Sequence, residues 1–371
     1  MRQVLKTYDL VLKVKGPVFI GNGLEIQKKE YLFLDKTRIG IVDAAKLYQL
    51  AKKKRITDDL ERFMVMDTKE DLKHWTMRNH ITLKEIEDCM KYEEKVGDRQ
   101  EEKGKLQLMC CTADPYGNPY IPGSSVKGML RTILLGSALL QRKGEYARNA
   151  RQMQLDMQEP KIRRQTFLNK SVRDMENRTF HTLNRPDTRV EDAVNDYMSG
   201  VIVSDSEPIS REQVILCQKW ERHLDGSEKA INILRECIKP GTLIRCKLTI
   251  DASVCPLTVA DIRESVGLFY QQYYGVFQKK FPGTDRGSCN TVLLGGGSGF
   301  VSKTIIYDLF EQPDAVKVTR DIFEKTMSNK VFREHKHFTD TKVGVSPHIL
   351  KCTRYQGKSY MMGQCELTIS E

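Results

Sequence analysis

The sequence predicts an α+β protein built from two ferredoxin-like units, and two observations support this fold class. The chain has 371 residues, too many for one small core. Strand-like and helix-like segments are intermixed in each half, without the regular alternation of a doubly wound sheet. We expect an N-terminal unit (1–140) with a helical insertion at about 43–103, a basic, partly flexible insertion or linker (141–195), and a C-terminal unit (196–371).

The N-terminal unit is expected to begin with strands and continue with helices. Residues 4–15 alternate between apolar and polar side chains, which is the strand period. Tyr31–Leu34 and Ile39–Val42 flank a short polar turn and predict a hairpin. Asp43 is a capping residue type, and a helical, highly charged pattern follows it. Thr82–Glu85 is a capping-box sequence that opens a further helix.

The strongest helical pattern follows a second strand-like segment, Leu106–Cys111. It begins within Ile121-Pro-Gly-Ser-Ser-Val-Lys-Gly-Met-Leu-Arg131. Apolar residues then recur at i, i+3, i+4, i+7 and i+8 from Val126 to Leu134. This spacing predicts a helix with one buried stripe.

The start of this helix has the composition of an anion site. Ser124 or Ser125 is expected to cap it, and Lys127 and Arg131, four residues apart, share another face. A free helix N-terminus with hydroxyls, glycines and a nearby lysine attracts anions. The alternative is an ordinary capped helix whose Lys and Arg are solvated.

The next segment is strongly basic. Residues 141–190 carry twelve Lys or Arg against six Asp or Glu, and their apolar periodicity is poor. This composition predicts an extended, partly disordered insertion. Such segments often become ordered on nucleic acid, and they are about equally often plain surface.

The C-terminal unit mixes strands with one long helix. Val201–Asp205 and Thr242–Ile250 have strand character, and Tyr355–Tyr360 and Cys365–Ile369 are expected to form a closing strand pair. Thr258–Asp261 is a capping box for a helix that runs to about residue 280. Aromatic residues at helical spacing on that helix are expected to belong to the core, namely Phe269, Tyr270, Tyr273, Tyr274 and Phe277.

A glycine-rich segment, Leu294-Gly-Gly-Gly-Ser-Gly-Phe300 with Lys303 after it, would let bare backbone approach a phosphate beside a cation. The alternative is a tight turn or close packing between elements. It does not match a dinucleotide fingerprint, because Phe300 stands where glycine is needed. The Gly123–Gly128 spacing does not make a P-loop either, because Met129 and Leu130 follow instead of Lys and Ser or Thr. Both patterns therefore favour a polynucleotide over a mononucleotide.

Composition sets the class of partner and the compartment. The chain has 60 Lys and Arg against 49 Asp and Glu, a formal charge of +11, a pI near 9.0 and a mean hydropathy of −0.48. This excess indicates a polyanionic partner or an acidic protein neighbour, unless it is only a charged, soluble surface. The ten cysteines include no C-x-x-C spacing, which is typical of reduced thiols. Without a signal pattern or an apolar run long enough to span a bilayer, we expect a cytoplasmic protein with no membrane role.

Several segments resemble the RAMP proteins of CRISPR systems, whose domains are RRM-like with glycine-rich loops. Residues 295–300 resemble the signature loop of that superfamily, and Ile121–Arg131 resembles a helix-opening motif of its type III subunits. Because the matching segments span nearly the whole chain in order, it is similar to the subunit that caps the 3′ end of the guide RNA (crRNA) in type III-A Csm complexes. The further matching segments are Pro17–Gly23, Val201–Glu207, Gly299–Thr304 and Val345–Lys351.

This resemblance implies a noncatalytic crRNA-binding and assembly role at the crRNA 3′ end, which contributes to 3′-end maturation and antiviral defence. The implied partners are crRNA, the repeated RAMP backbone subunit, the small helical subunit, target RNA near the 3′ end of the guide, and a host nuclease for trimming. Target cleavage in such complexes uses an Asp after the first strand of the backbone subunit, and Gly16–Glu30 contains no Asp. The residues expected to bind RNA are Gly21, Gly23, Ser124, Ser125, Lys127, Arg131, Gly295, Gly296, Gly297, Ser298, Gly299, Phe300 and Lys303.

Two enzymatic alternatives are weighed against this role. A metal-independent endoribonuclease that processes precursor crRNA needs a general base and acid, most often His. His335 and His337 flank Lys336 and could line one strand face, but no histidine spacing demands catalysis. Metal-dependent hydrolysis needs clustered acids, yet Asp58–Asp59 and Glu93–Glu94 lie on expected helices, where neighbours diverge by ~100°. We therefore expect no catalytic residue, metal or cofactor. The full set of histidines is His74, His80, His181, His223, His335, His337 and His348.

Overall fold

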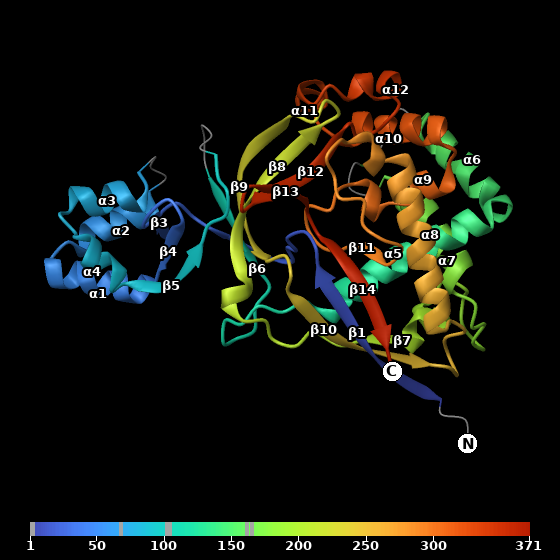
Figure 1. Cartoon of the computed structure of the whole chain (residues 1–371), viewed down its shortest axis with the longest axis horizontal. Helices are drawn as coiled ribbons and strands as arrows, with labels where there is room; N and C mark the ends of the chain where they lie inside the picture. Colours follow the sequence, from blue (N-terminus) through green and yellow to red (C-terminus); the bar gives the residue numbers. More distant parts are fainter. Residues whose placement is uncertain (1–3, 67–69, 101–105, 160–162, 164–166) are drawn as a thin grey trace.

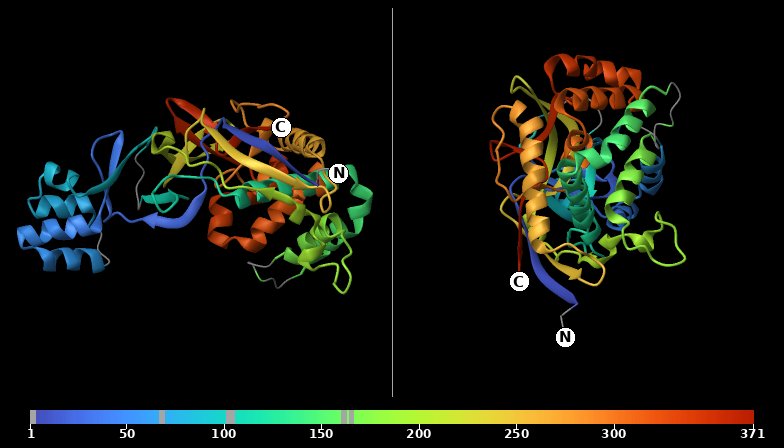
Figure 2. Two further views of the ribbon diagram at one scale, coloured as in Figure 1. Left: turned by 90° about the horizontal axis from the view of Figure 1, so that it is seen from below. Right: turned by 90° about the vertical axis from the view of Figure 1, so that its right-hand side faces the viewer.

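The computed structural model describes residues 4–66, 70–100, 106–159, 163 and 167–371, and it consists of a body and a lateral lobe (Figure 1). The lobe contains the first four helices and projects from one end of the body, as the left view of Figure 2 also shows. The body contains two β-sheets and the other helices. The start of β1 and the C-terminus lie on the side of the body away from the lobe.

The first body sheet has the strand order of a ferredoxin-like unit. All its strand pairs are antiparallel, and α5 and α8 pack against each other beside it. Without the inserted elements, the order along the chain is β1–α5–β7–β10–α8–β14, which is a βαββαβ unit. On β1, Leu10, Leu12 and Val14 are buried, as the alternation predicts. The sheet runs in the order β11 (Thr291–Leu293), β14 (Gln364–Ser370), β1 (Leu5–Val14), β10 (Leu243–Asp251) and β7 (Val201–Val203).

The second body sheet has six strands, and only its β6–β9 pair is parallel within the described residues. Both sheets combine strands from before residue 141 with strands from after residue 195. The sheets therefore do not correspond one to one with the predicted ranges, because strand pairing joins distant segments. The predicted α+β class with ferredoxin-like units is confirmed. The order is β13 (Lys358–Met361), β12 (Ile349–Tyr355), β8 (Val214–His223), β9 (Glu228–Ile238), β6 (Gln107–Cys111) and β2 (Gly21–Ile26).

The body helices enclose the main core. The aromatic stripe of α8 is buried at Phe269, Tyr270, Tyr273 and Phe277, and its capping box at Thr258 is present, as predicted. No helix among the described residues combines the length and apolar character needed to cross a bilayer. The helices are α5 (Gly123–Gln141), α6 (Ala147–Asp156), α7 (Asn169–Phe180), α8 (Val259–Val276), α9 (Ile306–Leu309), α10 (Gln312–Thr326), α11 (Asn329–Glu334) and α12 (Asp340–Val343).

Helix α5 forms where it is predicted, but the predicted serine cap is wrong. The N-cap residue is Pro122, and neither Pro122 nor the predicted serines provide a side-chain cap for the helix. The backbone N–H of Gly123 donates to Asp205 Oδ1 at 2.8 Å, from the loop after β7. A carboxylate 82 residues away in sequence thus satisfies the helix start, which leaves both serine hydroxyls for other contacts.

The basic segment is helical and packed over residues 143–156 and 169–180, so the expectation of an extended chain is wrong there, whereas residues 181–190 form a mostly exposed loop. It forms α6 and α7, whose Met153, Met175 and Phe180 are buried in the main core. Tyr146 and Thr179 hydroxyls are 2.7 Å apart and link the two ends of the segment. A few large side chains at wide spacing supply this packing, which explains the weak periodicity. Residues 160–162 and 164–166 of the segment lie outside the described residues.

The lobe places three strands beside four helices. The hairpin of β3 and β4 is present, and Asp43 and the Thr82–Glu85 capping box begin α1 and α4 as predicted. A separate small core, including Leu47 and Trp75, holds the helices together. The elements are β3 (Tyr31–Phe33), β4 (Arg38–Val42), α1 (Ala44–Lys54), α2 (Thr57–Val65), α3 (Leu72–Arg78), α4 (Leu83–Glu87) and β5 (Met90–Lys95).

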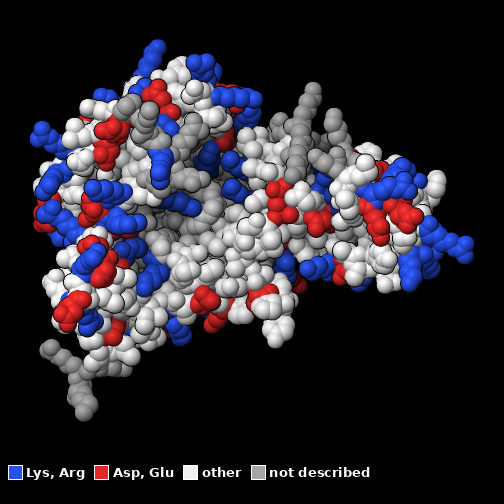
Figure 3. Space-filling view, turned by 180° about the vertical axis from the view of Figure 1, so that it is seen from behind, with Lys and Arg blue, Asp and Glu red and all other residues white. Residues whose placement is uncertain are grey.

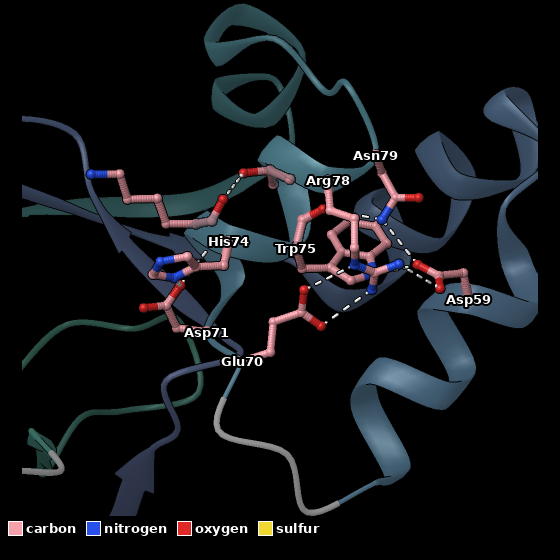
Figure 4. Close-up of polar contacts among 9 residues, drawn as sticks. Asp59, Glu70, Asp71, His74, Trp75, Arg78 and Asn79 are labelled. Carbon is pink, nitrogen blue, oxygen red and sulfur yellow. Dashed lines mark hydrogen bonds and ion pairs between the residues drawn. The ribbon is translucent and has the colours of Figure 1, made fainter.

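One member of the predicted acidic pair Asp58–Asp59 has a structural role in the lobe. Asp59 accepts hydrogen bonds from Trp75 Nε1 and Asn79 Nδ2, both at 2.9 Å (Figure 4). Arg78 bridges Asp59 and Glu70 at 2.9 and 3.0 Å. The carboxylate therefore fastens α2 to α3 while the Asp58 side chain is exposed, which leaves the two acids without a shared ligand position.

The second acidic pair, Glu93–Glu94, lies on strand β5, so its predicted helical placement is wrong. Glu93 is exposed and pairs with Arg38 at 3.0 Å. Glu94 is buried and lies 2.8 Å from Arg211, which also contacts Glu236 at 3.3 Å. Burial raises the pKa of Glu94 to about 7, against the opposing effect of Arg211. Because neighbouring residues of a strand point to opposite faces, Glu93 and Glu94 lie on opposite sides of β5. The buried contacts of Glu94 connect β5 of the lobe to the second body sheet.

The expected closing strand pair is also wrong. Tyr355 ends β12, and the residues up to Tyr360 form the turn and first part of β13 in one hairpin of the second sheet. Cys365–Ile369 lies in β14 and pairs with β1 and β11 in the first sheet. Adjacent strands at the end of the chain thus belong to different sheets.

Replacing the buried Asp308 with Asn is expected to stabilise the protein at alkaline pH. Asp308 is 5% exposed, and burial raises the pKa of its carboxyl from 3.8 to about 7, against the opposing charge of Lys143. An acid with a raised folded pKa loses stability as pH rises between its unfolded and folded pKa values, here between about pH 4 and 7. Free energies of unfolding measured at pH 5 and pH 8 should show an Asp308→Asn advantage that grows by roughly 2–4 kcal/mol.

The exposed Asp174→Asn variant on α7 serves as the control and should show no such growth. An Asp308→Asn advantage that stays constant from pH 5 to pH 8 would contradict the assignment.

Candidate nucleic-acid interface

Five of the predicted RNA-binding residues line one hollow in the body. They are Gly21, Ser125, Gly295, Gly296 and Lys303, and the hollow has a volume of about 380 Å³. We call it the glycine hollow. The start of α5 and the glycine loop therefore converge on one site, although they are far apart in sequence.

Small residues on α5 open one wall of the glycine hollow. Ser125, Gly128 and Thr132 follow the helical spacing i, i+3 and i+7 and all line it. Nothing lies within 4 Å of the position that a Cβ on Gly128 would occupy. Met129, expected in the core, is only partly buried and also lines the hollow. The row of small residues is the sequence signal that would have identified Gly128 and Thr132.

The glycine loop is held by a close approach to Phe19. The N–H of Gly296 donates to Phe19 O at 2.7 Å, so this amide is not free for a phosphate. By contrast, the amides of Gly297, Ser298 and Gly299 have no acceptor within the part of the chain that the structure describes. Three unused amides in one loop can donate to a phosphate oxygen.

Two cations beside the loop have no acidic partner among the described residues. The Lys303 side chain is exposed overall. Partial desolvation of its ammonium, followed by the charge of Arg235, lowers the pKa of Lys303. Arg235 on β9 approaches the same loop, because its Nη1 would lie 2.6 Å from a Cβ on Gly297. Burial likewise lowers the pKa of Arg235, and its Nε is buried without a hydrogen-bond partner. Two neighbouring unpaired cations favour an anion at this position.

Arg235 was not identified from the sequence. Its guanidinium stacks over the Phe19 ring at 5.2 Å, and its Nη1 is 3.9 Å from Met362 Sδ. Neither partner carries a negative charge, so these contacts position the guanidinium without neutralising it. The sequence offers no local signal for Arg235, since it lies within an ordinary strand and reaches the loop only through sheet pairing.

Other predicted RNA-binding residues lie elsewhere. Arg131 pairs with Asp196 at 2.7 Å and Glu176 at 3.4 Å and stacks over Phe180, so its charge is used within the fold. Lys127 is half-buried, and burial lowers the pKa of its ammonium.

Six further predicted residues also do not line the glycine hollow, and two of them are Gly297 and Gly299 of the glycine loop. The Phe300 ring packs against Phe323 at 4.9 Å, and Ser298 Oγ donates to Gly295 O at 3.0 Å. Ser124 and Gly23 are exposed. These residues shape or flank the site rather than line it.

Positive charge extends beyond the glycine hollow. In the space-filling view of Figure 3, Lys and Arg side chains gather in and around a depression of the larger body. Lys219, on β8, has basic neighbours: burial and then the charge of Lys351 lower its pKa to about 8, against the opposing charge of Glu221, which lies 3.8 Å away. A basic surface of this kind attracts a polyanion over more than one contact.

The histidines do not form the predicted strand face. His335 ends α11, and His337 opens the 3-10 turn His337–Thr339. The His337 ring is 2% exposed and contacts Asp340, which keeps it from an RNA ribose in this arrangement. The rings of His335 and His337 are stacked at 5.6 Å, so the pair lies in a packed corner rather than an open cleft.

Comparisons with known proteins agree with this fold. A family model described as the RAMP superfamily matches residues 11–281. A protein named "CRISPR system Cms protein Csm5" from Mycobacterium tuberculosis (strain CDC 1551 / Oshkosh) is 31% identical over 401 residues, covering 100% of this chain and 99% of that protein. A protein of the same name from Streptococcus thermophilus is 26% identical over 85% of this chain and 84% of its own length.

Solved structures show the same fold at lower sequence identity. A chain of the "Csm-crRNA-target RNA ternary complex in type III-A CRISPR-Cas system" is 18% identical, with a TM-score of 0.68 over 97% of this chain and 100% of that chain. The crystal structure titled "T.onnurineus Csm5" has a TM-score of 0.59 at 19% identity, over 96% of this chain and 99% of that chain.

Proposed function

The chain belongs to the RAMP superfamily and, within it, to the Csm5 family, and on this premise we propose that it is a noncatalytic crRNA-binding and assembly subunit at the crRNA 3′ end of a type III-A interference complex. The observation that carries this proposal is the convergence of the α5 start, the glycine loop and Lys303 on the glycine hollow. The unpaired Arg235 behind the loop adds a second cation.

The geometry supports contact with the sugar–phosphate backbone rather than with bases. Small side chains from α5 leave room for an RNA strand in the glycine hollow. The unpaired amides of residues 297–299 and the Lys303 ammonium are groups that can bind phosphate oxygens. Such contacts provide affinity without sequence preference. A guide RNA whose sequence varies requires this kind of recognition.

The proposed partners follow from the family and from this contact mode. They are the crRNA 3′ region, target RNA near it, the repeated RAMP backbone subunit and the small helical subunit. We further propose that the subunit presents the crRNA 3′ end to a host nuclease for trimming, since no catalytic residue of its own is assigned. An antiviral RNA-guided assembly of this kind would work in the cytoplasm.

Titration of the purified chain with guide-length single-stranded RNA over a salt series tests the proposal. The logarithm of the binding constant should fall linearly with the logarithm of salt, by about 0.7 per neutralised phosphate, and the RNA should be recovered intact. Salt-independent binding would contradict phosphate recognition. EDTA-resistant cleavage of repeat RNA that is abolished by His335→Ala or His337→Ala would instead establish an endoribonuclease.

A further inference from the structure

Two histidines and one aspartate meet in the C-terminal part of the body, outside the residues that line the glycine hollow. Asp340 is the first residue of α12, and His348 immediately precedes β12. One ligand atom from each of His337, Asp340 and His348 lies within 4.8 Å of the other two. His337 is 2% exposed and Asp340 is 0% exposed, whereas His348 is only partly buried, so the cluster lies just beneath the surface.

The Asp340 carboxylate is placed between the two imidazoles. Its Oδ2 lies 3.0 Å from Nδ1 of His337, and its Oδ1 contacts Nδ1 of His348. The Ser346 hydroxyl donates to Oδ2. The imidazoles of His337 and His348 and the carboxylate of Asp340 therefore place nitrogen and oxygen atoms around one point, although they come from a turn, the start of α12 and the residue before β12.

The electrostatics of the cluster call for a cation. Among the described residues, no Lys or Arg forms an ion pair with Asp340. Its partners are His337 and His348, which carry a positive charge only when protonated, and a buried carboxylate that faces neutral imidazoles lacks a compensating charge. The three side chains with neutral imidazoles carry a net negative charge, which a bound cation would neutralise.

We propose that His337, Asp340 and His348 bind one divalent transition-metal ion, with Zn²⁺ as the preferred metal. Two imidazoles and one carboxylate form a borderline ligand set that suits Zn²⁺ better than Mg²⁺ or Ca²⁺. Each imidazole coordinates through Nδ1 and keeps its proton on Nε2. Ser346 Oγ or a water completes a four-coordinate site.

The metal has a structural role. The ring of Phe323, on α10, packs against His337 at 4.6 Å, and His348 leads directly into β12. An ion shared by His337 and His348 therefore joins the α10–α12 helices to strand β12 of the second sheet. Because the ion binds only the folded site, it should raise the melting temperature.

Metal analysis of the full-length chain tests the proposal. The protein is purified without chelators or immobilised metal, and its metal content is measured by inductively coupled plasma mass spectrometry. We expect about one Zn²⁺ per chain and a melting temperature that falls with chelator and returns with Zn²⁺. After removal of Zn²⁺, added Co²⁺ should give the visible absorption of a four-coordinate site. His348→Gln and Asp340→Asn should lose at least roughly tenfold in affinity for either metal.

The control is Asp71→Asn, because Asp71 and His74 form an exposed contact at 2.7 Å, and among the described residues no third His, Cys, Asp or Glu joins them in a possible metal-binding group. This variant should keep the metal. Wild-type protein with no Zn²⁺ above background, no thermal response to Zn²⁺ and no Co²⁺ spectrum overturns the proposal, whatever the variants do. Retention of the Co²⁺ spectrum by His348→Gln, or its equal loss in Asp71→Asn, overturns it as well. If Asp340→Asn fails to fold, the wild-type titration and His348→Gln decide.

Discussion

Replacing both Lys303 and Arg235 with Met is expected to weaken binding of guide-length RNA by roughly a hundredfold at moderate salt. Each charge-assisted hydrogen bond contributes about 1.5 kcal/mol or more, and about 1.4 kcal/mol corresponds to a factor of ten. The log–log salt slope should also become shallower by about 1.4, since about 0.7 is lost for each phosphate contact. Fluorescence anisotropy over a salt series measures both quantities.

The same double variant should be as stable as the wild type or more stable. Neither cation has an acidic partner among the described residues, and burial lowers the pKa of Arg235, as crowding does for Lys303. Each positive charge therefore lowers the free energy of unfolding of the free protein, and a bound phosphate offsets this loss. Lys53→Met, at an exposed position on α1, is the matched control for loss of one charge. Unchanged RNA affinity, or a loss explained by a lower melting temperature, would refute this role.

Gly295→Ala is expected to lower the melting temperature by roughly 5–10 °C. Gly295 has φ of +83°, and an added Cβ would lie 2.3 Å from Phe19 O. The loop cannot retreat, because the neighbouring Gly296 N–H is bonded to that same oxygen at 2.7 Å. Left-handed backbone strain and overpacking together cost about 2–5 kcal/mol.

Gly299→Ala separates the two causes within one loop. Gly299 has φ of +94°, and nothing lies within 4 Å of its hypothetical Cβ. Only the backbone strain of about 1–2 kcal/mol should therefore appear, and the melting temperature should fall by less than half as much. Differential scanning fluorimetry of both variants makes the comparison. Equal effects would show that the approach to Phe19 is not what fixes the loop.

The sequence predicted most of the local structure. The caps at Asp43, Thr82 and Thr258 form as expected, because each depends on residues only a few positions apart. The buried aromatic stripe of α8 was predicted for the same reason, since one helix sets its spacing. The α+β class and the family were also recognisable from the chain alone.

The failures concern contacts between distant residues. The serines were expected to cap α5, but Asp205 provides the acceptor from another loop. Glu94 was placed on a helix by its charged surroundings, whereas pairing with β4 and the Arg211 partner hold it in a strand. The His337–Asp340–His348 cluster was missed because the spacing of these residues matches no metal-binding motif, and only folding brings the turn at His337 next to the start of β12.

The amino-acid order by itself determined the helix starts at Asp43, Thr82 and Thr258 and the aromatic stripe of α8. Only the tertiary structure decided that Arg235 stands behind the glycine loop without a counter-charge, while Arg131, equally basic, is neutralised by Asp196. The reason is physical. Capping and periodicity act over a few residues, whereas the pairing and desolvation of a charge depend on groups that only folding brings together.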